Sequence, residues 1–124
     1  MTSRPIPRDE WAAFLDSFSR SHEGWLCALE ITEENAPPVV AALDVPLAGM
    51  TLREHDGGCV ISIDVGTRGA TPVNHVVREP VAIGVDMTEH GEDEGLHITA
   101  AHHTARLRFR VAALPETLDG IVLP

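Results

Sequence analysis

Residues 6–25 read Ile-Pro-Arg-Asp-Glu-Trp-Ala-Ala-Phe-Leu-Asp-Ser-Phe-Ser-Arg-Ser-His-Glu-Gly-Trp. This segment decides the fold because it carries a clear helical period. Four large apolar side chains recur at i, i+3, i+4 and i+7 and share one stripe: Trp11, Phe14, Leu15 and Phe18. Pro7 before the stripe and Gly24 after it are start and stop signals. We therefore predict one amphipathic helix over residues 8–22, laid on a domain that is otherwise β.

The rest of the chain alternates apolar and polar residues in short runs, which are separated by glycine, proline and acidic residues. Asp56-Gly57-Gly58 predicts a tight turn between two such runs, Ala101–His103 predicts a second, and Pro46 is expected to end a strand. Residues 73–78 fit either a short strand or a helical turn. The predicted strands are 25–32, 39–45, 49–55, 59–65, 81–87, 96–100 and 105–111.

About seven short strands with regular turn signals favour a mainly β, α+β fold with one N-terminal helix. The expected architecture is a small antiparallel barrel or sandwich, analogous to SH3, Sm-like and PRC-type barrels. A chain of 124 residues has room for one core, so we predict a single domain over residues 1–113 and a C-terminal tail over residues 114–124.

The charge balance argues against nucleic acid as a partner. The net charge is −10, from 19 acidic and 9 basic residues, and every basic residue is arginine. No apolar run approaches the roughly 18 residues of a membrane helix, and the start lacks a signal-peptide pattern. We predict a soluble cytoplasmic protein with no membrane partner. The absence of lysine and tyrosine is typical of a GC-rich bacterial genome.

Catalytic and cofactor motifs are missing from the sequence. Cys27 and Cys59 each lie inside an alternating run, which predicts two core thiols rather than a redox or zinc motif. Glu54 and Asp64 flank the first hairpin, but no nucleophile pattern or phosphate loop converges on them. We therefore predict no cofactor and no enzymatic activity.

Histidine offers one alternative to that prediction. The chain has seven histidines, and His97, His102 and His103 surround the second predicted hairpin, close to Glu94. Imidazole and carboxylate groups suit zinc or another divalent ion. Adjacent histidines on a turn usually point to opposite sides, however, so solvated turn and strand positions explain the same pattern.

Arginine marks the last predicted strand. Arg106, Arg108 and Arg110 alternate along its outward face. Such a stripe suits recognition of an anion or an acidic partner, because guanidinium groups bind carboxylate and phosphate in bidentate fashion. Ion pairing with acidic residues on a neighbouring strand is the structural alternative.

Several short motifs resemble those of a family of small uncharacterised bacterial proteins. The matching segments are Pro7-Arg8, Trp11–Phe14, Ser19-Arg20, Gly24-Trp25, Pro46–Gly49, His75–Pro80 and Leu107–Phe109. The resemblance covers about residues 5–110, and the motifs consist mostly of structural residue types. The family carries only a domain-of-unknown-function label, so the resemblance implies no activity and no site.

Together these observations predict a noncatalytic interaction or assembly module. It would associate with itself or with a protein partner through an exposed sheet edge, the arginine stripe or the apolar tail at residues 118–124. The alternative is a β-barrel that binds a small ligand or a divalent metal through its histidine-rich hairpin. A hydrolase built from scattered histidines and acids would need residues far apart in sequence to meet in one pocket.

Overall fold

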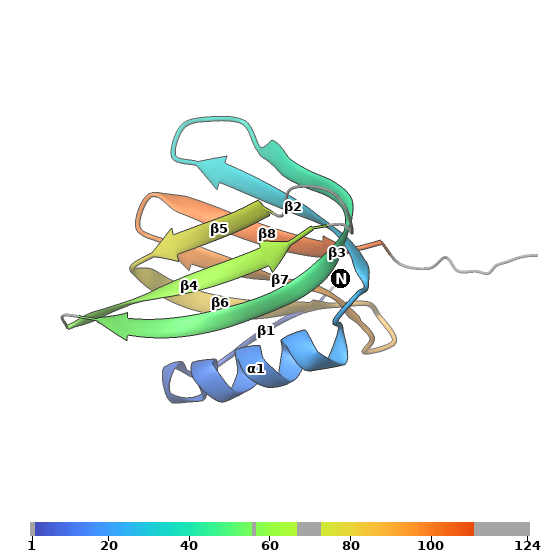
Figure 1. The fold of residues 1–124 in the computed structure, drawn as a ribbon, viewed down its shortest axis with the longest axis horizontal. Helices are drawn as coiled ribbons and strands as arrows, with labels where there is room; N and C mark the ends of the chain where they lie inside the picture. The colour runs from blue at the N-terminus through green and yellow to red at the C-terminus, as the bar shows by residue number, and fades with distance from the viewer. Residues whose placement is uncertain (1, 56, 67–72, 111–124) are drawn as a thin grey trace, which may run out of the picture.

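A computed structural model describes residues 2–55, 57–66 and 73–110 and contains one α-helix and eight strands (Figure 1). A 3-10 turn, η1 (Arg8–Glu10), leads into the helix. The predicted C-terminal tail lies outside the described residues. The elements are β1 (Thr2–Pro5), α1 (Trp11–Ser21), β2 (Leu26–Glu33), β3 (Val39–His55), β4 (Gly58–Val65), β5 (Val73–Arg78), β6 (Pro80–Met87), β7 (Asp93–Ala100) and β8 (His103–Phe109).

The strands form one antiparallel sheet in the order β1-β6-β7-β8-β2-β3-β4-β5. This confirms the prediction of a mainly β fold with one N-terminal helix. The sheet curves so that β4 and β5 face β6 and β7 across the core (Figure 1). It does not close into a complete barrel, because β1 and β5 remain its two end strands.

The stripe of α1 packs against β3, as the helical period predicts. Trp11, Leu15 and Phe18 are buried, and Phe14 is partly buried at the border of the same cluster. The indole Nε1 of Trp11 donates a hydrogen bond to the carbonyl oxygen of Ile6 at 2.9 Å. This bond fixes the start of the helix to the segment that leaves β1.

Strand β3 corrects the prediction that Pro46 separates two strands. Pro46 pairs with Leu26 of β2, and pairing with β4 begins at the next residue, Leu47. A proline has no N–H to contribute to a ladder, so strands tolerate it where the pairing changes. Its carbonyl oxygen still accepts a hydrogen bond from the backbone N–H of Gly66 at 3.1 Å.

Strand β1 has no counterpart in the sequence prediction. It pairs with β6 from Thr2 opposite Met87 to Pro5 opposite Gly84. A short polar segment with a proline carries no alternating apolar signal, and such segments are found at the ends of sheets. The ambiguous residues 73–78 form a strand, β5, rather than a helical turn.

The two predicted hairpins are present, with small differences at their turns. Gly57 adopts φ +79° between β3 and β4, a conformation that favours glycine, and Asp56 lies outside the described residues. His103 begins β8 instead of belonging to the turn. Asp93 begins β7, three residues before the predicted strand over residues 96–100.

Cys27 and Cys59 are free and buried, as predicted. Trp25 is two residues before Cys27 in the predicted strand 25–32, a spacing that would place both on one face, but it precedes β2 and is 48% exposed. Its ring packs edge-on against His22 and Phe109. This packing covers part of the indole without placing it in the core.

Trp11→Ala is expected to lower the free energy of unfolding by about 3–5 kcal/mol, because the indole is almost completely buried. Trp25→Ala is the matched control and should cost clearly less. Urea unfolding of both variants measures the difference. Equal losses would contradict the contrast in burial between the two tryptophans.

Candidate functional site

The arginine stripe of β8 lies on the outer face of the sheet, where each guanidinium group has an acidic neighbour. Arg106 Nε lies 3.7 Å from an Asp86 carboxylate oxygen. The corresponding distance is 3.5 Å for Arg108 and Glu30, and 3.7 Å for Arg110 and Asp44. These ion pairs agree with the structural alternative, and recognition of an anionic partner by the stripe stays a prediction.

Asp86 of β6 is the most deeply buried acid of this face, with a side chain only 8% exposed. Its Oδ1 accepts a hydrogen bond from Nδ1 of His97 at 3.0 Å, while Oδ2 faces Arg106. Gly84 makes room for the imidazole, since a Cβ there would lie 2.6 Å from Cε1 of His97. The Asp86 carboxylate therefore contacts the guanidinium group of Arg106 on β8 and the imidazole of His97 on β7.

Asp86→Ala should lower the free energy of unfolding by about 1–3 kcal/mol, because it removes the hydrogen-bond acceptor of His97 and the charge that faces the buried Nε of Arg106. Glu34→Ala removes the exposed partner of His102 and serves as the control, with an expected loss below about 1 kcal/mol. Chemical unfolding of both variants makes the comparison. A larger loss for Glu34→Ala than for Asp86→Ala would refute the assignment.

The structure places the three candidate metal ligands in different environments. His97 belongs to the Asp86 cluster, whereas His102 lies in the β7–β8 turn and donates from Nδ1 to Glu34 at 2.8 Å. His103 lies on β8 with the same orientation as buried Ala105. Among the described residues, no three His, Cys, Asp or Glu side chains are arranged to hold a metal ion.

His75 is a polar position that the sequence analysis did not single out. It lies on β5 two residues before buried Val77, and its ring is 5.9 Å from that of His103 across the core. Its buried Nε2 has no hydrogen-bond partner within the described part of the chain. Burial lowers the pKa of His75, and so does His103, while Glu33 opposes the shift. Assigning residues 73–78 to a strand would have indicated this inward position.

The lowered pKa of His75 makes stability depend on pH below the ordinary histidine value of 6.5. As the pH falls below that value, the unfolded chain binds the proton more readily than the folded protein, so the free energy of unfolding decreases. His75→Gln should make this decrease shallower. Urea unfolding between pH 7.5 and pH 5, roughly one unit on either side of the transition, measures the effect.

His90→Gln is the control for this experiment, because His90 is exposed in the β6–β7 loop. Its pH profile should match that of the wild type. An unchanged profile for His75→Gln would show that His75 does not cause the decrease.

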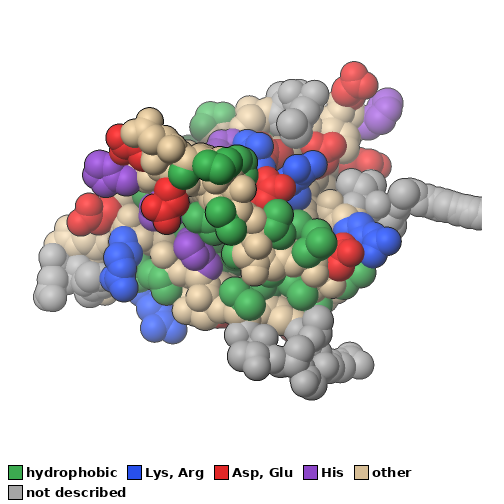
Figure 2. All heavy atoms as spheres, turned by 90° about the horizontal axis from the view of Figure 1, so that it is seen from above, with side chains coloured by type: hydrophobic (Ala, Val, Ile, Leu, Met, Phe, Trp, Pro, Cys, Tyr) green, Lys and Arg blue, Asp and Glu red, His purple; other side chains and the backbone are tan. Residues whose placement is uncertain are grey.

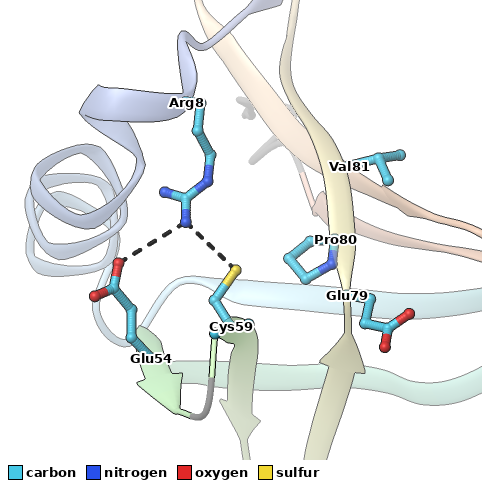
Figure 3. A pocket seen from close by; sticks show the side chains of 8 residues that line it. Arg8, Glu54, Cys59, Glu79, Pro80 and Val81 are labelled. Atoms are coloured by element: carbon cyan, nitrogen blue, oxygen red, sulfur yellow. Dashed lines mark hydrogen bonds and ion pairs between the residues drawn. The ribbon is translucent and has the colours of Figure 1, made fainter.

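An open pocket of about 700 Å³ lies where the start of the helix meets the β3–β4 hairpin (Figure 3). The guanidinium group of Arg8 stacks 4.7 Å from the ring centroid of Trp11. Its Nη2 points toward Cys59 Sγ at 3.6 Å and a Glu54 carboxylate oxygen at 3.8 Å. Glu79, with φ +52°, lines the opposite wall.

In this pocket the ion pair between Arg8 and Glu54 lies beside the buried thiol of Cys59. The described lining residues of the pocket include one arginine, two glutamates and one cysteine. Glu54 and Asp64, which flank the hairpin in sequence, do not meet here, since Asp64 instead accepts a hydrogen bond from Asn74. The two acids that flank the hairpin are therefore not brought together in this pocket.

The first half of β3 is the most exposed apolar part of the described structure. We call residues 39–45 the β3 edge. Val39, Val40 and Leu43 are 61%, 53% and 64% exposed. The view onto the side from which the β2–β3 hairpin projects shows hydrophobic side chains gathered between charged ones (Figure 2). Exposed apolar patches of this kind are typical of interaction surfaces.

Comparison with known proteins gives a family without an assigned role. The model of a family of unknown function (DUF5335) matches residues 2–117, nearly the whole chain. No curated protein and no solved structure matches the chain.

Proposed function

The chain belongs to the family DUF5335, and we propose that it is a noncatalytic interaction module that binds a protein partner through the β3 edge. The exposure of Val39, Val40 and Leu43 on one strand carries this proposal. Covering a large aliphatic side chain contributes roughly 1.5–3 kcal/mol, so three together can support a stable contact.

The polar clusters of the described residues support the noncatalytic part of the proposal. Asp86 is occupied by His97 and Arg106, and Arg8 is occupied by Glu54 and Cys59. A catalytic base needs a nucleophile or substrate proton within hydrogen-bond reach. In each cluster the available groups pair with one another instead.

The charge of the chain narrows the class of partner. A net charge of −10 disfavours nucleic acid, which proteins bind largely through cationic contacts to phosphate. None of the described helices is long and apolar enough to span a membrane. The proposed setting is a bacterial cytoplasm, and the proposed partner is a protein that pairs with an extended strand.

Leu43→Glu tests the proposal by placing a charge on the β3 edge. The variant should weaken association at least about tenfold, equivalent to about 1.4 kcal/mol, because the new carboxylate would be desolvated at the contact. Native mass spectrometry of the untagged protein, alone and with its isolated partner, measures the loss. The fold should persist, since Leu43 is 64% exposed.

Val81→Glu is the matched control, because Val81 is 63% exposed but lies on β6. It should leave association unchanged. A wild-type protein that remains monomeric and partnerless would overturn the proposal, and so would a partner retained equally by both variants.

A further inference from the structure

We infer that the partner of the β3 edge is an acidic protein segment whose carboxylates bind Arg108 and Arg110 on the outer face of the sheet. The inference rests on the proposed function and adds the chemistry of the partner. The contact would extend from β3 over β2 to the end of β8. We call Leu26, Leu43, Arg108 and Arg110 together the leucine–arginine face.

Strand pairing places leucine and arginine side chains on the same side of the sheet. Cys27 of β2 lies opposite Phe109 of β8, and both side chains are buried. Because side chains alternate along a strand, the residues next to this pair point outward: Leu26, Arg108 and Arg110. The backbone N–H of Arg110 donates to the carbonyl oxygen of Leu26 at 2.9 Å, so the pairing of the two segments continues to this point.

Leu43 joins this face from β3. Its neighbour Ala42 packs against the core, and Leu43 points away from the core with 64% of the residue exposed. Asp44, the next residue, has a carboxylate oxygen 3.7 Å from Nη1 of Arg110. Leu26 is 41% exposed. Two exposed leucines therefore lie beside two arginines, an arrangement that suits apolar and charged contacts with one partner.

The arginines of this face keep N–H donors for a partner. Nη1 of Arg108 lies 3.5 Å from a Glu30 carboxylate oxygen, and the side chains of Arg108 and Arg110 are 62% and 64% exposed. The distances of 3.5 and 3.7 Å exceed the roughly 2.7–2.9 Å of a short charged hydrogen bond. Exposed ion pairs of this kind contribute little to stability. A partner's carboxylate can therefore bind the fork of each guanidinium group in their place.

Charge complementarity selects an acidic partner for this face. The chain has 19 acidic and 9 basic residues, so its net charge repels carboxylates, whereas two of the nine arginines lie together here and are exposed. A basic segment would meet like charges at Arg108 and Arg110, which disfavours its binding. An extended segment that alternates aliphatic and acidic side chains offers both kinds of group that the leucine–arginine face can bind.

Fluorescence polarisation with labelled synthetic peptides and the full chain tests the inference. A peptide of alternating leucine and aspartate should bind at least about tenfold more tightly than one of alternating leucine and lysine, a difference of about 1.4 kcal/mol. Replacing both arginines, Arg108→Gln with Arg110→Gln, should weaken binding of the leucine–aspartate peptide by a similar factor. Arg20→Gln is the matched control, because Arg20 is an exposed arginine paired with Asp16 on α1, and it should leave binding unchanged.

Glu30→Gln combined with Asp44→Asn should have the opposite effect. Both carboxylates compete with the partner for the two guanidinium groups, so their removal should strengthen binding of the leucine–aspartate peptide several-fold. Asparagine tolerates the φ of +54° at residue 44. Far-UV circular dichroism checks that each variant is folded.

Equal binding of the two peptides, or binding of neither, would overturn this inference. Weaker or unchanged binding by the variant with Glu30→Gln and Asp44→Asn would overturn it as well. If association in native mass spectrometry still depends on Leu43 in any of these cases, the proposed function stands. A wild-type protein without any partner in that measurement would overturn both.

Discussion

Strand β3 pairs first with β2 and then with β4 along its length, and the rest of the structure depends on this change of partner. Its first half pairs with β2 and its second half with β4, and the change occurs between Pro46 and Leu47. The helix α1 packs against the same strand with its buried stripe. One continuous strand thus joins both parts of the curved sheet and supports the helix that covers it.

The same change of partner leaves an apolar edge exposed. Because β4 begins to pair only at Leu47, the outer side of residues 39–45 faces no strand among the described residues. Val39, Val40 and Leu43, which lie on this segment, have exposed side chains. The exposed surface on which the proposed function rests is a direct consequence of the way the sheet is joined.

On the outer face of the sheet, the arginines of this acidic, lysine-free chain form ion pairs with carboxylates. Arg106, Arg108 and Arg110 each lie beside a carboxylate from another strand. Asp86 is the most buried of these acids and also holds His97. Exposed ion pairs contribute little to stability, so the buried Asp86 cluster is the part of this face that contributes most to the free energy of unfolding.

The sequence by itself determined the class of fold, because helical and alternating periods act over a few neighbouring residues. Trp11, Leu15 and Phe18 indicated the buried stripe, and Cys27 and Cys59 indicated core positions. Local patterns could not reveal β1 or the continuity of β3 through Pro46, since both depend on pairing with distant strands. Only the tertiary structure separated His97, His102 and His103, brought His75 to His103, and left residues 39–45 paired with β2 alone among the described strands. These outcomes depend on strand order and register.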